Sequence, residues 1–189
     1  MKHPYVWLSI FTLCFNHSIL HAEKKTNNVE EIGSFGDWKA YATSEKKKKI
    51  CYMVSLPKKQ EGDFKKRGKV YAMITHRPAS KSFNVVSFHA GYKFPKNSKV
   101  LLSIQTGKHK KEYDLFTDNE TAWAMSDGDD QEITKRLTKV GETLIVEGTS
   151  SKGTKTTDTY SLKGSMLAYK AICEACKASD METLKKSTQ

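Results

Sequence analysis

The sequence has few of the features that mark several large classes of protein. No stretch of about 18 or more apolar residues occurs in its 189 residues, so we expect no membrane-spanning helix. With 11 Gly and 4 Pro the chain is neither collagen-like nor of low complexity, and it has no internal repeat. Its length and its 38% of hydrophobic residues fit one globular domain with its own core.

The motifs of several enzyme classes are also absent. The sequence has no H-E-x-x-H, G-x-S-x-G or P-loop pattern, and His76, His89 and His109 lie far apart in it. Asp127–Asp130 resembles half of a calcium loop, but its twelfth position is Thr138 rather than an acid. We therefore expect no enzymatic activity, no cofactor and no metal site. A pocket that gathers distant His, Asp or Glu side chains stays open as an alternative.

The N-terminal segment has the pattern of a secretory signal peptide. A short basic region and an apolar stretch precede Leu20–Ala22, which ends in a small residue as cleavage sites do. We predict a signal peptide over residues 1–22, and hence a periplasmic or secreted protein; the alternative is a buried N-terminal helix. Residues 23–34 are polar and aperiodic and predict a flexible arm, and residues 179–189 are expected to form a C-terminal tail.

Three cysteines remain after the predicted cleavage: Cys51, Cys173 and Cys176. In an oxidising compartment two of them should pair and one should be left over. The Cys173–Cys176 spacing is that of a redox or zinc half-site, but no second pair of ligands accompanies it. A bridge from Cys51 to the C-terminal helix is favoured, because closing so long a loop stabilises a fold by roughly 4–5 kcal/mol in the chain-entropy model. A catalytic Cys51–His76 pair is the weaker interpretation.

The rest of the chain is dominated by short segments with strand character, bounded by turn residues. They are Trp38–Ala42, Ile50–Leu56, Val70–His76, Asn84–His89, Val100–Thr106, Glu112–Phe116, Thr121–Met125, Leu144–Gly148 and Thr157–Leu162. Such spacing favours a sandwich or barrel. We expect Trp38, Trp123 and Tyr160 to fill its core.

Two helices interrupt the strands. Asp129 or Asp130 can cap a short helix near residues 130–139, and a second, C-terminal helix is predicted from Gly164 to Lys177. The sequence therefore predicts a mainly β fold: a single-domain, antiparallel, jelly-roll-like β-sandwich over residues 35–178, with these two helices.

Positive charge is concentrated in the first half of the chain. Residues 23–111 hold 21 Lys and Arg against 7 Asp and Glu, whereas residues 112–189 hold 10 against 14. The cations cluster between predicted strands, where they could converge at one end of the fold and attract a polyanion; the plainer interpretation is solvated loops that keep the protein soluble. The candidate binding residues are Lys46, Lys47, Lys48, Lys49, Lys65, Lys66, Arg67, Lys108, Lys110 and Lys111.

Several short motifs, taken in order, point to one family. They are Phe35–Tyr41, Lys49–Tyr52, Tyr113–Phe116, Thr121–Trp123 and Gly148–Leu162. In these motifs the chain resembles the invasion-associated locus B family of alphaproteobacterial exported proteins over residues 33–176. The resemblance implies a secreted or periplasmic, mainly β domain without known enzymatic activity, associated in some pathogens with entry into host cells. It also implies a Cys51–Cys176 disulfide with Cys173 as the odd thiol, although Ala42 replaces a cysteine that many members carry.

Charge and resemblance together predict an exported binding protein, and the resemblance implies a role in host interaction or virulence. Its expected partner is an acidic surface, such as a host glycan, lipopolysaccharide or an anionic membrane, captured by the basic loops. Nucleic acid is a poor fit, because the sequence has no helix-turn-helix, zinc-finger or RRM signature. The alternative is a periplasmic factor for envelope maintenance or assembly that binds a protein partner through a strand edge.

Overall fold

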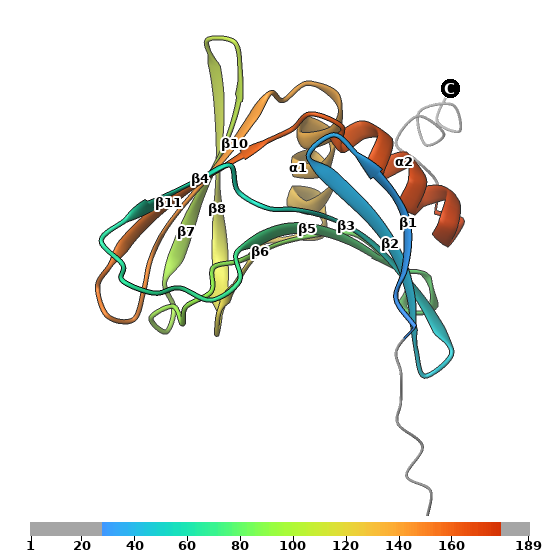
Figure 1. Ribbon diagram of the computed structural model, residues 1–189, viewed down its shortest axis with the longest axis horizontal. Coiled ribbons are helices and arrows are strands. Elements are labelled where there is room, and N and C mark those ends of the chain that lie inside the picture. Colours follow the sequence, from blue (N-terminus) through green and yellow to red (C-terminus); the bar gives the residue numbers. More distant parts are fainter. Residues whose placement is uncertain (1–27, 179–189) are drawn as a thin grey trace, which may run out of the picture.

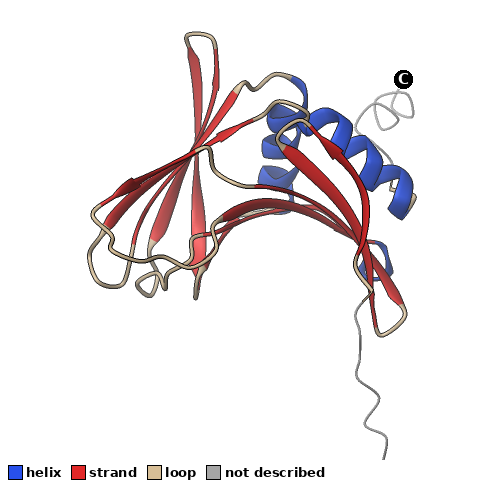
Figure 2. Ribbon diagram, in the orientation of Figure 1, coloured by secondary structure: helices blue, strands red, loops and turns tan. Residues whose placement is uncertain are grey.

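The computed structural model describes residues 28–178, and Figure 1 shows how their strands and helices are arranged. The strands are β1 (Glu30–Phe35), β2 (Trp38–Glu45), β3 (Lys48–Ser55), β4 (Lys59–Gly62), β5 (Tyr71–Arg77), β6 (Ser82–His89), β7 (Lys99–Thr106), β8 (His109–Asp118), β9 (Thr121–Ala124), β10 (Thr143–Thr149) and β11 (Lys155–Ser161). The helices are the short 3-10 helix η1 (Pro78–Ser80), α1 (Asp127–Lys139) and α2 (Ser165–Cys176). The predicted mainly β fold with two helices is confirmed (Figure 2). Among the described residues no helix has the length and apolar character needed to cross a membrane.

All eleven strands belong to one antiparallel sheet. Their order is β1-β2-β3-β5-β6-β9-β8-β7-β10-β11-β4. Hydrogen bonding continues across the centre of this sheet, where Ser87 on β6 pairs with Trp123 on β9. The predicted antiparallel layers are thus parts of one continuous sheet, which does not close on itself because β1 and β4 are its edges.

The sheet bends strongly, and its two halves approach each other on the inner side. The rings of Phe88 on β6 and Tyr160 on β11 have centroids 6.4 Å apart, although four strands separate β6 from β11 in the sheet. At the same end of β11, next to Tyr160, the Trp38 Nε1–H donates to the Ser161 carbonyl at 3.0 Å. These contacts join the first strands to the last and enclose the core.

One face of the sheet carries the core. Trp38 and Ala40 on β2 are fully buried, as is Tyr160 on β11, and the intervening residues point outward with the period of two that strands impose. The expectation that Trp123 fills the core is wrong. Because β9 turns Ala122 inward, the adjacent Trp123 lies half-buried on the opposite face.

Both α-helices cover this inner face. The helix α1 packs on β6, and α2 packs on β1, β2 and β3. Ser126 caps α1, since its Oγ accepts the Asp129 N–H at 3.2 Å. The predicted cap at Asp129 or Asp130 is wrong, because Asp130 instead accepts the Val86 N–H from β6 at 2.7 Å. The prediction of a helix from Gly164 to Lys177 is confirmed, with those residues as its caps.

A disulfide between Cys51 on β3 and Cys176 on α2 fixes the C-terminal helix to the sheet. This is the pairing that the family resemblance implied. Cys173 lies one turn earlier on α2 and is buried outside the disulfide.

The segment before Trp38 differs from the prediction. We expected a flexible arm over residues 23–34, but Glu30–Phe35 form β1, which pairs with β2 in an antiparallel register. The polar composition of this segment hides its strand character, because no residue of β1 is fully buried and its order comes from pairing with β2 and packing against α2. The predicted signal peptide, residues 1–22, and C-terminal tail, residues 179–189, lie outside the described residues.

Candidate functional site

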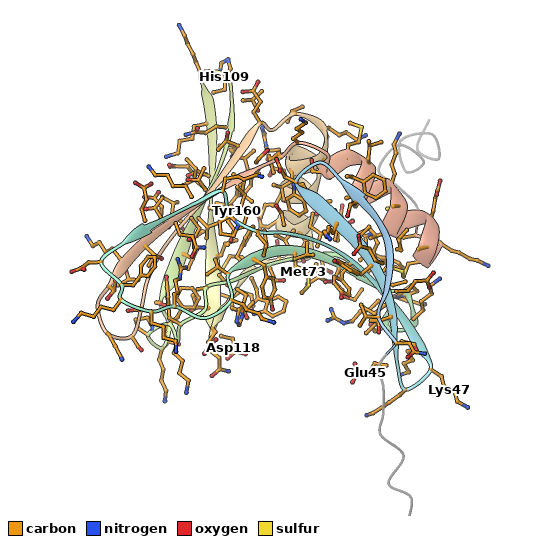
Figure 3. The ribbon with its side chains drawn as sticks, in the orientation of Figure 1. Glu45, Lys47, Met73, His109, Asp118 and Tyr160 are labelled. Carbon is orange, nitrogen blue, oxygen red and sulfur yellow. A yellow bond between two sulfur atoms is a disulfide. The ribbon has the colours of Figure 1, made fainter. Side chains whose placement is uncertain are left out.

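The three predicted basic clusters lie in three separate places. Lys46 and Lys47 form the turn between β2 and β3, both with positive φ, and Lys108 lies in the turn between β7 and β8. Figure 3 shows Lys47 and His109, at the tips of these two hairpins, toward opposite ends of the molecule. The segment that carries Lys65 and Lys66 follows β4 on a third side, at the left in Figure 1. The expectation that the clusters converge at one end of the fold is therefore wrong.

Each cluster instead borders its own hollow, and each hollow is also lined by at least one basic side chain that was not among the predicted binding residues. Arg77 joins Lys46, Lys48 and Lys49 around a hollow of about 250 Å³. Arg136 joins Lys110 and Lys111 around one of about 420 Å³. Lys47 and Lys108 lie at the turns and line neither hollow.

The third hollow is the largest, at about 530 Å³, and we call it the lysine-rimmed pocket. Its exposed basic residues are four lysines from three separate segments, Arg67 is a fifth basic residue in its lining, and its one acid is Asp63. The lining residues are Asp63, Phe64, Lys65, Lys66, Arg67, Tyr92, Lys93, Ser150, Ser151, Lys152, Thr154 and Thr156. The excess of positive charge at this rim attracts anions.

Arg67 organises the pocket from below rather than lining its rim. Its guanidinium donates to both carboxylate oxygens of Asp158, at 2.7 and 2.6 Å, and its Nε–H donates to the Ala90 carbonyl at 2.6 Å. Both side chains of the pair are only 4% exposed. The prediction that Arg67 is a binding residue is wrong, because its charge is buried and matched by Asp158 and is not available to an external anion.

Two aromatic rings flank this guanidinium. The Arg67 Cζ lies 5.4 Å from the centroid of the Phe64 ring and 4.9 Å from that of Tyr92. The Tyr92 hydroxyl is hydrogen-bonded to Thr156 Oγ1 at 2.7 Å, and burial raises the pKa of this phenol. The floor of the pocket is therefore aromatic and without net charge.

The loop between β10 and β11 holds the other two lysines in place. Ser150 is buried, and its Oγ accepts the backbone N–H groups of Lys152 and Thr154 at 3.3 and 3.1 Å. The Ser151 N–H donates to the Lys93 carbonyl at 2.7 Å. Lys93 and Lys152, distant in sequence, are thereby brought to the same rim.

A second group of chemically interesting residues lies in the core. His76 is 1% exposed, and its Nδ1 accepts the Asn84 N–H at 3.1 Å. In a neutral ring this leaves the proton on Nε2, which lies 3.4 Å from the Cys173 sulfur. Burial lowers the pKa of His76 to about 4, so the ring is neutral at physiological pH.

This core cluster does not have the geometry of a nucleophile activated by a base. A base must accept the thiol proton, whereas His76 Nε2 already carries one. Cys51 lies opposite His76 in the β3–β5 register, but its sulfur is in the disulfide. The Cys51–His76 interpretation is therefore wrong.

The acidic residues at Asp127–Asp130 form the first turn of α1, which begins earlier than the predicted cap at Asp129 or Asp130. Asp130 faces the core, and burial raises its pKa to about 6. Among residues 28–178, no three His, Cys, Asp or Glu side chains are arranged to hold a metal ion.

These features define a mainly β protein with one long-range disulfide and with hollows on its surface that are lined by basic side chains. The model of the invasion associated locus B (IalB) protein family matches residues 38–173, so the chain belongs to this family. Comparison with curated proteins and with solved structures finds no match.

Proposed function

We propose that this chain is an exported, non-enzymatic binding protein that captures an acidic surface at the lysine-rimmed pocket. The observation that supports the proposal most is the gathering of Lys65, Lys66, Lys93 and Lys152 around one hollow that contains a single acid, Asp63. Lysine ammonium groups are mobile point charges, which suit phosphate, sulfate and carboxylate groups in varied arrangements. Export is supported by the family and by the disulfide, which persists in oxidising compartments. The same family name motivates a role in host interaction.

Retention on heparin, on lipopolysaccharide and on anionic vesicles tests this proposal at low and at high ionic strength. We expect binding at low salt that weakens steeply as salt is added, because exposed charges are screened. Two charge-reversed variants locate the binding surface. The pocket variant carries Lys65→Glu, Lys66→Glu, Lys93→Glu and Lys152→Glu; the tip variant carries Lys46→Glu, Lys47→Glu, Lys48→Glu and Lys49→Glu.

Both variants change the net charge by the same amount, so each controls for the other. We expect the pocket variant to lose at least about tenfold in affinity and the tip variant to stay within about threefold. Equal weakening of the two would mean that net charge alone drives binding and would overturn the assignment to this pocket. Absence of binding at low salt would overturn the proposal as a whole.

A second candidate function is supported by the edge of the sheet. Strand β1 pairs only with β2, so its other edge is open among the described residues. An open edge can accept a strand of another protein, as a periplasmic assembly or envelope-maintenance factor would require. A stoichiometric protein partner that co-purifies from envelope fractions at high salt would favour this function. A protein partner that dissociates at the same salt concentration as heparin would count against this second function.

A further inference from the structure

We infer that the lysine-rimmed pocket takes an amphiphilic anion, in which a phosphate or sulfate group meets the lysines and an attached apolar group covers Phe64 and Tyr92. This inference rests on the proposed function and narrows its ligand. The lysines alone would attract a lipid-like anion and a purely polar polyanion equally, whereas the aromatic rings favour the lipid-like anion.

The floor of the pocket offers aromatic surface and no unmatched charge. The Phe64 and Tyr92 rings both lie close to the Arg67 guanidinium, whose charge is already matched by Asp158. A polyanion at the rim would gain nothing from these rings. An apolar group would gain by removing their exposed surface from water.

The Phe64 ring is held at the surface by the backbone beneath it. Gly62 has φ of +140°, a value that side chains disfavour, and a Cβ there would overlap the Lys155 carbonyl. The Phe64 N–H donates to the Gly62 carbonyl at 3.1 Å. This turn at the end of β4 sets the ring beside Arg67 instead of letting it fold into the core.

The other two basic hollows provide an internal comparison. The hollow at the β2–β3 tip has Ile50 as its large apolar residue, and the one near the β7–β8 tip has Ile104 and Val140. Neither is lined by Phe, Tyr or Trp. Aromatic floor and basic rim coincide only at the lysine-rimmed pocket among these three, and its volume of about 530 Å³ is within the usual range for small-molecule sites.

Titration calorimetry with three soluble probes tests the inference on the intact protein. The probes are monomeric dihexanoyl phosphatidylglycerol, which has both parts; glycerol phosphate, which has a phosphate at least as charged but no chains; and monomeric dihexanoyl phosphatidylcholine, which has the chains with a zwitterionic head. We expect the first to bind at least about tenfold more tightly than either of the others, because a few buried methylene groups are enough for that factor.

Two single substitutions separate the floor from general hydrophobicity. Phe64→Ala should remove most of the affinity that the acyl chains add and should leave the affinity for glycerol phosphate unchanged. Phe64→Leu should retain part of the affinity that the chains add. Phe116→Ala is the matched control, since Phe116 is 44% exposed on the outer face of the sheet, and it should have no effect. Vesicles of long-chain phosphatidylglycerol then tell whether the pocket also reaches an anion embedded in a membrane or takes only the dispersed molecule.

Comparing the affinities of the three probes distinguishes a failure of the inference from a failure of the proposed function. Equal affinity for glycerol phosphate and dihexanoyl phosphatidylglycerol would overturn the amphiphile inference while leaving salt-dependent capture of acidic surfaces intact. Equal affinity for the two lipids would show that a net negative charge is not required at this site and would overturn both.

Discussion

Arg67 and Asp158 form a buried, bidentate ion pair across 91 positions of sequence. The pair joins the segment between β4 and β5 to the middle of β11, and Arg67 also donates to Ala90 at the start of the segment that carries Tyr92 and Lys93. Three of the segments around the lysine-rimmed pocket are therefore held by one guanidinium.

We expect Asp158→Ala and Arg67→Ala each to lower the free energy of unfolding by about 3–5 kcal/mol, because either change leaves a buried charge without its partner. Urea denaturation measures this, and the double variant should lose clearly less than the sum of the two. Asp114→Ala is the control. It breaks the Lys99–Asp114 pair, whose side chains are 64% and 53% exposed, and should cost no more than about 1 kcal/mol. Similar losses at both pairs would contradict the central role of Arg67.

Removing the disulfide should destabilise the protein strongly. The bridge spans 125 positions of sequence, so Cys51→Ala or Cys176→Ala should cost about 5 kcal/mol in the chain-entropy model. Cys173→Ala leaves the bridge intact and should cost about 1–2 kcal/mol through the lost contact with His76. Denaturation with and without reductant measures both effects. A peptide map that links Cys51 to Cys173 would contradict the prediction.

Two buried groups should give opposing dependences of stability on pH. Burial lowers the pKa of His76 to about 4, so below pH 6.5 the unfolded chain binds a proton there that the folded chain does not, and acid destabilises the fold. Burial raises the pKa of Asp130 to about 6, so below that pH the folded chain binds the extra proton, and acid stabilises the fold. Between pH 4 and pH 6 the two effects largely offset each other.

Asp130→Asn removes one of these effects and keeps an oxygen that can accept the Val86 N–H. In this variant the free energy of unfolding should fall by about 3 kcal/mol between neutral pH and pH 4, following His76 alone. Urea denaturation at several pH values measures the slope. An unchanged slope relative to the unsubstituted protein would refute this interpretation of Asp130.

Two glycines with similar backbone angles should respond differently to alanine. Gly164, with φ of +91°, precedes α2, and a Cβ there would overlap the Phe35 carbonyl. Gly153, with φ of +84°, has open space around the same position. Both Gly→Ala variants carry backbone strain of about 1 kcal/mol, and Gly164→Ala should lose at least about 2 kcal/mol more through the clash. Thermal unfolding compares the two, and equal losses would contradict the close approach at Gly164.

The elements that the sequence predicted correctly depend on local patterns. Alternation and turn residues marked most strands, and the spacing of apolar residues marked α2. Local patterns did not place Trp123 correctly. Its large ring on a strand was expected in the core, but the face of the sheet that Trp123 occupies depends on the register of β9 against β6. Ser126 rather than Asp130 caps α1, because the Asp130 carboxylate accepts the Val86 N–H of β6, a partner distant in sequence.

By itself, the sequence determined the β-rich class, the C-terminal helix, the cysteines able to bridge it to Cys51 and the clustering of the lysines, because each follows from periodicity or composition within a short stretch. The clusters were expected in loops, but Lys48 and Lys49 lie in β3, and Lys110 and Lys111 lie in β8. Only the tertiary structure decided that one bent sheet contains every strand, that Lys93 and Lys152 join Lys65 and Lys66, and that Arg67 is withdrawn from the rim. The physical reason is that these relationships arise from contacts between segments dozens of positions apart. Such contacts leave no periodic signal in the chain, and they form only when burial of the common core brings the segments together.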